Sequence, residues 1–160
     1  MEYLKLDTLA LHTVDKGDRV ALEFIKKLCH DKSISERFTG ITGGLLSNPN
    51  NEFFGYGFLV TYNNEYIGYI RIGNIFEDEK SVYLRAAIDK DARGHNFGAT
   101  LLNEITEYIF YNFHEVESIR LKIAPDNIPS LKTAEAGGYK WLSEDYFIKY
   151  NPYLTNEIKK

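Results

Sequence analysis

The stretch RGHNFGATLL, residues 93–102, joins an alternating apolar segment to a helical pattern, and its residue types could bind phosphate. The first amides of a helix have no partner within the helix, and the helix dipole adds partial positive charge there. Gly94 and Gly98 keep bulky side chains away from these amides, and Arg93 could add a charge-assisted contact. The stretch also fits a plain turn, in which Gly98 packs against a strand and Arg93 is a solvated surface charge.

A second helix start lies in APDNIPSLKTAEAGG, residues 124–138, after the next alternating segment. Asp126 or Asn127 can cap this helix, Ser130 falls in its first turn, and Gly137 ends it. Because neighbouring parallel strands open at one carboxyl edge of a sheet, both helix starts can serve one ligand. Taken singly, Asn127 is an ordinary N-cap and Ser130 a polar first-turn residue. Neither familiar nucleotide loop, GxxxxGK(S/T) or GxGxxG, is present in the sequence.

Hydrophobic spacing predicts the elements that must position these residues. Residues 81–89 alternate like a strand, residues 96–113 have helical spacing, and residues 118–124 alternate again, so the crossover makes the two strands parallel. The remaining expectations are a strand at 9–14, a helix through 21–30 capped by Asp15 or Asp18, a short helix at 33–38 capped by Ser33 or Ser35, a loop at 39–57, a hairpin at 56–73 turning at Asn63 and Asn64, and a bent strand or hairpin at 139–151. This order predicts an α/β fold with a mixed sheet.

Composition limits the class of protein. With 160 residues, 44% hydrophobic and 26% charged, the chain fits one domain at 1–153 and a frayed tail at 154–160. A net charge of −4 argues against non-specific nucleic-acid binding, which needs a basic face. One cysteine, Cys29, and four scattered histidines predict a reduced, cytoplasmic protein without a metal. We expect no membrane insertion, because no apolar run approaches ~20 residues.

Together these features resemble the GNAT superfamily of acyl-CoA-dependent N-acyltransferases, over most of the chain. RGHNFGA resembles the Q/R-x-x-G-x-G/A motif, and NIPSLKTAEAGGY resembles N-x-x-(S/A)-x-x-x-(Y/A)-x-x-x-G-(F/Y). Asn96 stands where the family usually has its first glycine, and asparagine tolerates unusual backbone angles. The resemblance implies a mixed, mostly antiparallel central sheet of about seven strands flanked by about four helices, with a splayed parallel strand pair that holds coenzyme A (CoA).

The resemblance also implies a binding site for acetyl-CoA as cosubstrate. The diphosphate would lie on the amides of residues 93–99 and the pantetheine arm along residues 86–88. A bulge would splay this strand, and the amide of Ala86 would polarise the thioester carbonyl as an oxyanion donor. The implied cofactor-binding residues are Ala86, Ala87, Ile88, Arg93, Gly94, His95, Asn96, Phe97, Gly98, Ala99, Asn127 and Ser130. On composition alone, Ala86 and Ala87 fit plain packing under a helix equally well.

The implied catalytic groups are sparse. Ser130 holds the position at which relatives resembling the ribosomal-protein N-terminal acetyltransferases carry a serine near the sulfur, whereas Ala134 replaces the usual tyrosine acid. Tyr139 is expected in the core. No acid lies within residues 81–89, and the acidic segment 77–79 is expected to be a solvated loop, so the general base is unassigned. The variable acceptor region corresponds to residues 39–51.

The preferred interpretation is an acetyl-CoA-dependent N-acetyltransferase in which a primary amine attacks directly within a ternary complex, with a protein or peptide N-terminus as acceptor. The alternatives are acetylation of a small-molecule amine (polyamine, amino sugar or antibiotic), a non-catalytic module that senses acyl-CoA, and a protein-binding domain whose loop holds no cofactor. Acetyl-CoA and the amine are the expected partners, without membrane, nucleic acid or metal. The oligomeric state is left open, a homodimer included.

Overall fold

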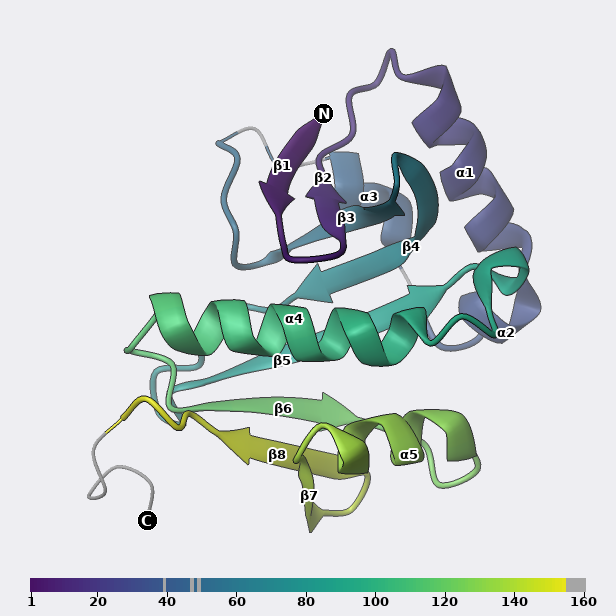
Figure 1. Ribbon diagram of the computed structural model, residues 1–160. Helices are drawn as coiled ribbons and strands as arrows, with labels where there is room; N and C mark the ends of the chain where they lie inside the picture. Colours follow the sequence, from purple (N-terminus) through teal and green to yellow (C-terminus); the bar gives the residue numbers. More distant parts are fainter. Residues whose placement is uncertain (39, 47, 49, 155–160) are drawn as a thin grey trace.

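The computed structural model describes residues 1–38, 40–46, 48 and 50–154. In these residues, eight strands form one sheet in the order β1-β2-β3-β4-β5-β6-β8-β7. The strands are β1 (Glu2–Lys5), β2 (Ala10–His12), β3 (Tyr56–Tyr62), β4 (Glu65–Ile72), β5 (Ser81–Ile88), β6 (Ser118–Lys122), β7 (Lys140–Ser143) and β8 (Tyr146–Tyr150). All neighbours run antiparallel except β5 and β6, which are parallel (Figure 1). The expected tail lies, apart from residue 154, outside the described residues.

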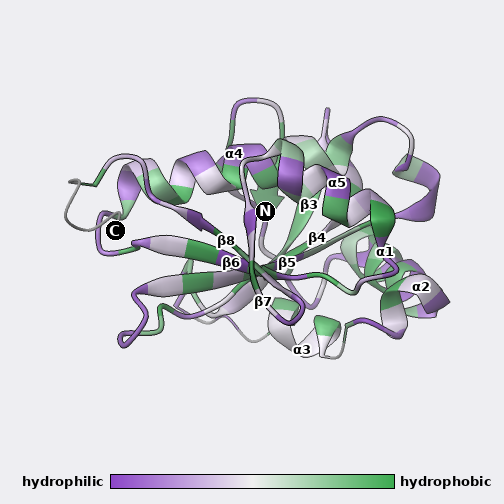
Figure 2. Ribbon diagram, turned by 90° about the horizontal axis from the view of Figure 1, so that it is seen from below, coloured by the Kyte–Doolittle hydropathy of each residue, from purple (hydrophilic) through white to green (hydrophobic). Residues whose placement is uncertain are grey.

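Helices cover both faces of the sheet (Figures 1 and 2). The helices are α1 (Arg19–His30), α2 (Lys32–Ser35), α3 (Ile41–Leu46), α4 (Phe97–Asn112) and α5 (Ile128–Ala136), with one 3-10 turn, η1 (Lys90–Ala92). The larger core joins α4 and α5 to side chains such as Phe58, Ile70 and Leu84, and the smaller core joins α1, α2 and α3 to Leu59 and Tyr69. Because side chains alternate along a strand, Ile70 and Ile72 of β4 enter the larger core and Tyr69 enters the smaller one.

Most predicted elements are confirmed. Helix α4 begins one residue after the predicted start, and α1 is capped by Asp18, whose carboxylate accepts from the amide of Ala21 at 3.1 Å. The 56–73 hairpin turns at Asn63 and Asn64, which have φ of 49° and 65°, and residues 139–151 form the hairpin β7–β8. The positive φ angles explain why asparagine occurs twice at the tight turn.

Two sequence expectations are wrong. The loop expected at 39–57 contains α3, a helix that includes two glycines and packs beneath β3 and β4. The short second helix begins at Lys32 and is capped by Asp31, so neither Ser33 nor Ser35 is its cap. An additional strand, β1, pairs with β2 at the edge of the sheet. The described residues thus include eight strands where about seven were expected, and five α-helices where about four were expected.

Candidate functional site

The parallel pair β5–β6 opens partway along its length. The register pairs Ser81 with Ser118 and ends at Leu84 with Leu121, although β5 continues to Ile88 alongside β4. The bulge implied by the resemblance is absent from both pairings, since neither shows a register shift. The expectation of a bulge is therefore wrong. The opening arises where the parallel pairing ends, one residue before the end of β6 at Lys122, while β5 continues to Ile88.

The backbone of β5 faces this opening at two residues. The amide of Gly73 donates to the carbonyl of Tyr83, and the amide of Asp89 donates to the carbonyl of Ile67, so odd-numbered residues direct their backbone groups toward β4. Backbone groups of an antiparallel strand alternate between its two sides. Those of Ala86 and Ile88 therefore point to the side that β6 has left, and the described residues of β6 do not pair with them.

The start of α4 lies at the same end of the molecule as the opening, where the chain leaves both β5 and β6 (Figure 1). Asn96 takes a left-handed conformation, with φ 61° and ψ 24°, as its position in place of a motif glycine requires. Its side chain does not cap the helix, and the amides of Phe97, Gly98 and Ala99 donate to no group among the described residues. Three amides at the positive end of the helix dipole are thus available to an anion.

The two glycines of this stretch border open space. A Cβ added at Gly94 would have no heavy atom within 4 Å, and one added at Gly98 would meet only the Ile88 Cγ1 at 4.0 Å. The interpretation in which Gly98 is needed for packing against a strand is therefore not supported. Gly94 has a φ of 89°, which favours glycine, whereas Gly98 is exposed on an ordinary helix turn. The space over the free amides fits a phosphate group.

Arg93 does not point into this space. Its Nε donates to the carbonyl of Ile88 at 3.1 Å, and its guanidinium lies 3.2 Å from the Ser33 Oγ and 3.5 Å from the Asp31 Oδ2. Hydrogen bonds from Ser33, and then the nearby Arg93 charge, lower the pKa of Asp31. In this conformation Arg93 joins the loop to the start of α2, and it would have to leave these partners to contact a phosphate.

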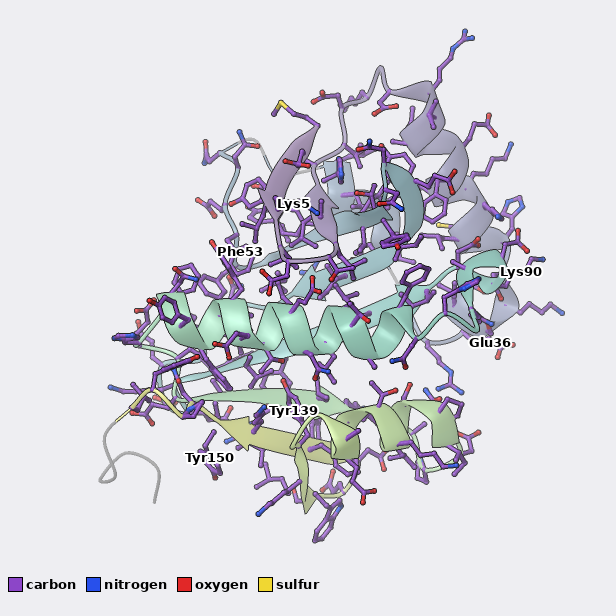
Figure 3. All side chains as sticks on the ribbon, viewed as in Figure 1. Lys5, Glu36, Phe53, Lys90, Tyr139 and Tyr150 are labelled. Atoms are coloured by element: carbon purple, nitrogen blue, oxygen red, sulfur yellow. The ribbon has the colours of Figure 1, made fainter. Side chains whose placement is uncertain are left out.

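A second cross-link holds the loop between β5 and α4 to α1. The Lys27 Nζ lies 2.9 Å from the Asp89 Oδ2 and 2.6 Å from the Asp91 Oδ2, and these hydrogen bonds raise the pKa of the lysine. The Asp89 side chain is only 5% exposed. Figure 3 shows Lys90, between the two aspartates, at the same end of the molecule as Glu36 after α2. Sequence reasoning missed this cross-link, because 62 residues separate Lys27 from Asp89.

The start of α5 brings the second predicted group of residues to the same edge. Asn127 occupies the N-cap position, but its side chain makes no capping hydrogen bond, so the ordinary N-cap interpretation does not account for it. Ser130 lies in the first turn and is half-buried. Ala134 is completely buried in the larger core. A hydroxyl is thus available at Ser130, and position 134 has none.

Other residues considered for chemistry have structural roles. Tyr139 is buried in the larger core, and its hydroxyl lies 2.7 Å from the Thr106 Oγ1 of α4 (Figure 3). Burial raises the pKa of Tyr139 far above the usual range. The expectation that it belongs to the core is confirmed. Glu77, Asp78 and Glu79 are exposed, and Glu79 forms an ion pair with Arg120. These observations fit the expected acidic surface loop.

Within the part of the chain that the structure describes, no helix is long and apolar enough to cross a membrane. The same residues contain no group of three or more histidine, cysteine or acidic side chains placed to hold a metal ion.

Comparison with solved structures supports the fold. A GNAT-family acetyltransferase from Bacillus anthracis superposes with a TM-score of 0.71 at 15% identity, over 92% of this chain and 98% of that one. A ribosomal L7/L12 α-N-protein acetyltransferase in complex with coenzyme A has a TM-score of 0.66 at 14% sequence identity. The match covers 91% of this chain and 98% of that one. A dodecameric spermidine N-acetyltransferase from Vibrio cholerae has a TM-score of 0.66 at 18% sequence identity, and the match covers 94% of this chain and 98% of that one. At these identities the likeness shows the fold alone.

Comparison of sequences adds the family. No curated protein sequence matches this chain. The family model described as the acetyltransferase (GNAT) family matches residues 22–139, a segment that includes the opening of β5–β6 and the starts of α4 and α5. Because this match spans well over half of the chain, the chain belongs to the GNAT family of acetyltransferases.

Proposed function

We propose that this acetyltransferase transfers the acetyl group of acetyl-CoA to the N-terminal amine of a protein or peptide, by direct attack within a ternary complex. The observation that carries the cofactor site is the open space over Gly94 and Gly98, next to three amides of α4 that have no partner among the described residues. An anionic diphosphate suits these amides and the helix dipole.

The residues around this space fit the rest of the cofactor. The amides of residues 93–99 would hold the diphosphate. The outward backbone edge of β5 at Ala86 would pair with the amide-containing pantetheine arm as a further strand does, and at Ile88 the arm would compete with Arg93 for the carbonyl. Asn127 and Ser130 face the same end of the sheet from α5. Acetyl-CoA supplies a thioester carbonyl that an amine can attack. The Ala86 amide would stabilise negative charge on that carbonyl oxygen.

The transfer forms one bond and breaks one. The amine nitrogen bonds to the acetyl carbon, the carbon–sulfur bond breaks, one proton leaves the nitrogen, and one proton reaches the sulfur. Only an uncharged amine can attack, and an α-amine, with a pKa of ~7.7–8.0, is more often uncharged near neutral pH than a lysine amine at ~10.4. With no base assigned in the described site, this difference favours an N-terminal acceptor.

We assign Ser130 a hydrogen bond to the leaving sulfur, through which a proton from water can pass. Its hydroxyl is a poor acid, so the assignment makes Ser130 a supporting group rather than the main proton donor. The buried Ala134 leaves no tyrosine hydroxyl in this helix turn. We also propose a cytoplasmic location, on the sequence ground of a single free cysteine, Cys29.

The missing hydroxyl at Ala134 also favours a second candidate, a module that binds acyl-CoA without turnover. Release of free thiol from acetyl-CoA in the presence of amine acceptors separates the two candidates. Acceptors for this measurement are N-terminal peptides, spermidine and an amino sugar. Thiol release that depends on an acceptor supports the enzyme, whereas cofactor binding without turnover of any acceptor supports the sensing module.

A thermal shift tests the cofactor site itself. Wild-type protein and the Gly98→Glu variant are heated with acetyl-CoA, CoA or dephospho-CoA, and Gly17→Glu is the matched control. Gly17 is also exposed and has no heavy atom within 4 Å of an added Cβ. A ligand at a hundred times its dissociation constant stabilises by ~2.7 kcal/mol, and we expect this shift in wild type and Gly17→Glu but not in Gly98→Glu. No shift in wild type, or an equal shift in Gly98→Glu, would remove the proposed site.

A further inference from the structure

Two arginines lie side by side next to the opening of β5–β6. Arg71 of β4 pairs directly with Arg85 of β5, and Arg85 immediately precedes Ala86. Tyr69, two residues before Arg71, and Ala87, two residues after Arg85, belong to the core beneath α1, α2 and α3. Both arginine side chains therefore leave the sheet on this face, opposite to α4.

The surroundings of the two guanidinium groups hold them in place. The Arg85 Cζ lies 4.7 Å from the centre of the Phe38 ring, and its Nη2 donates to the Arg37 carbonyl. Arg71 reaches the Tyr69 hydroxyl and α3, where a Cβ added at Gly44 would lie 2.9 Å from its Nη1. Burial raises the pKa of Tyr69, and both arginines oppose this rise, which places both charges near one buried hydroxyl.

In the part of the chain that the structure describes, neither arginine has an acidic partner. Among the described residues, no carboxylate lies within 4.0 Å of Arg71 or Arg85, whereas Lys27, Arg93 and Arg120 each pair with an acid. Like charges on directly paired strand residues repel each other. An uncompensated pair at this place is therefore unfavourable in the free protein, and an anion would relieve it.

The opposite side of the opening is also cationic. By the parallel register, Lys122 at the end of β6 lies on the same face as Arg85, and its Nζ lies 5.9 Å from the Tyr146 ring. Lys122 too has no carboxylate within 4.0 Å among the described residues. Arg37, in the loop after α2, has only a distant partner, Asp126, at 4.0 Å. Cations on the loop after α2, on β4 and β5, and on β6 thus surround the opening.

We infer that the acceptor is an acidic peptide N-terminus, whose carboxylate side chains close to the reacting α-amine are bound by Arg71 and Arg85. This inference rests on the proposed function, because it takes the opening as the place where amine and thioester meet. The cations are spread over more elements than a single carboxylate can contact, which favours an extended acceptor with several acids. A polyamine carries only positive charge and is disfavoured here.

Matched peptides test the acceptor. Initial rates of thiol release are measured with the C-terminally amidated peptides Ser-Glu-Glu-Ala, Ser-Gln-Gln-Ala and Ser-Lys-Lys-Ala, and with spermidine. All three peptides begin with the same residue, so the α-amine is closely matched. A hydrogen-bonded charge contributes roughly ten- to hundredfold, so we expect kcat/KM to fall by about that factor from the glutamate to the glutamine peptide and further for the lysine peptide.

Variants of Arg85 and Gly44 test whether the arginine pair causes the preference for the glutamate peptide. Arg85→Gln is expected to lower kcat/KM about ten- to hundredfold for the glutamate peptide and to leave the glutamine peptide within about twofold. A merely structural defect would lower both rates together. Gly44→Ala displaces the Arg71 guanidinium without removing its charge. It is expected to reduce the ratio of kcat/KM for the glutamate peptide to kcat/KM for the glutamine peptide. Arg19→Gln, at an exposed position of α1 without an ion pair among the described residues, is the control.

The outcomes separate the two proposals. A preference for the glutamate peptide that Arg85→Gln removes supports the inference. Equal rates with all three peptides, or spermidine as the best acceptor, would overturn the acidic acceptor while acetyl transfer stands. No acceptor-dependent thiol release from any of the four compounds would overturn the proposed function, and the inference with it.

Discussion

The two sides of the β5–β6 opening are built by different means. On the side of α4, the proposed recognition of the cofactor would depend on backbone: three amides without a partner among the described residues, a left-handed Asn96, and glycines that border open space. On the side of α1, α2 and α3, the inferred recognition of the acceptor would depend on the side chains of Arg71 and Arg85, which come from neighbouring strands and reach α3 and Phe38. The first arrangement suits a cofactor with a constant diphosphate, and the second can change with the acceptor while the fold stays the same.

The largest expected effect comes from two variants, one on each side of the opening, each of which should weaken the binding of one substrate only. Gly98→Glu is expected to weaken acetyl-CoA binding by more than about a hundredfold, since it puts charge and bulk over the free amides. Arg85→Gln is expected to leave acetyl-CoA affinity within about twofold and to act only on acidic acceptors. Calorimetric titration with acetyl-CoA and steady-state rates at varied peptide concentration measure the two effects. If each variant changed both quantities equally, the division into two sides would be wrong.

The backbone side was largely predictable from sequence. The motif stretch RGHNFGA is local, so the helix start, the turn and the tolerance of Asn96 for a left-handed conformation could all be predicted from neighbouring residues. The contacts of Arg93 with the start of α2 could not be predicted in this way. Its partners Asp31 and Ser33 lie about 60 residues away and meet it only because α2 packs beside the loop. Contacts of this kind leave no periodic signal in a single sequence.

Sequence reasoning mostly missed the side of the opening that carries Arg71 and Arg85. Helix α3 contains Gly43 and Gly44, which disfavour a helix locally, and packing beneath β3 and β4 overrides that preference. The alternation of residues 81–89 placed Arg85 on the correct face of its strand, but only the pairing with β4 brings Arg71 beside it. The ligand roles of residues 86–88, 93–99, 127 and 130, and the extent of the domain, stay predictions.

The next effect concerns the missing tyrosine of α5. Ala134 is completely buried in the larger core, so Ala134→Tyr is expected to overpack it and lower the free energy of unfolding by about 1–3 kcal/mol, without a gain in acetylation rate. Urea unfolding and thiol release measure both effects. Ala136→Tyr, on an exposed position of the same helix, should change stability by no more than about 0.5 kcal/mol. A faster, equally stable Ala134→Tyr protein would show that this turn can accept the tyrosine.

A smaller and opposite effect is expected at Gly98. Because an added Cβ meets only the Ile88 Cγ1 at 4.0 Å, Gly98→Ala should raise the free energy of unfolding by up to about 1 kcal/mol and still weaken acetyl-CoA binding. Gly94→Ala should instead destabilise by about 1 kcal/mol, since its φ is 89°. Denaturant unfolding and calorimetric titration distinguish the two variants. A stabilised Gly98→Ala protein with unchanged acetyl-CoA affinity would argue that no ligand approaches this residue.

The smallest effect concerns Arg93, which joins the loop before α4 to the start of α2. Asparagine caps a helix as well as aspartate, so Asp31→Asn removes the charge facing Arg93 and keeps the cap of α2. We expect the free energy of unfolding to fall by about 0.5 kcal/mol at pH 7, as for other partly exposed ion pairs.

The dependence on pH and salt tests this explanation. The pKa of Asp31 is lowered in the folded protein, so the carboxylate stabilises the fold above its unfolded pKa of about 3.9. This contribution is lost as pH falls through the lower folded value. Unfolding curves of wild type and Asp31→Asn should therefore converge once the pH is below the lowered folded pKa of Asp31, and also in high salt, where the charge is screened. A difference that persists under both conditions would mean that Asp31 acts through its hydrogen bonds to Ser33 and that Arg93 is not anchored by charge.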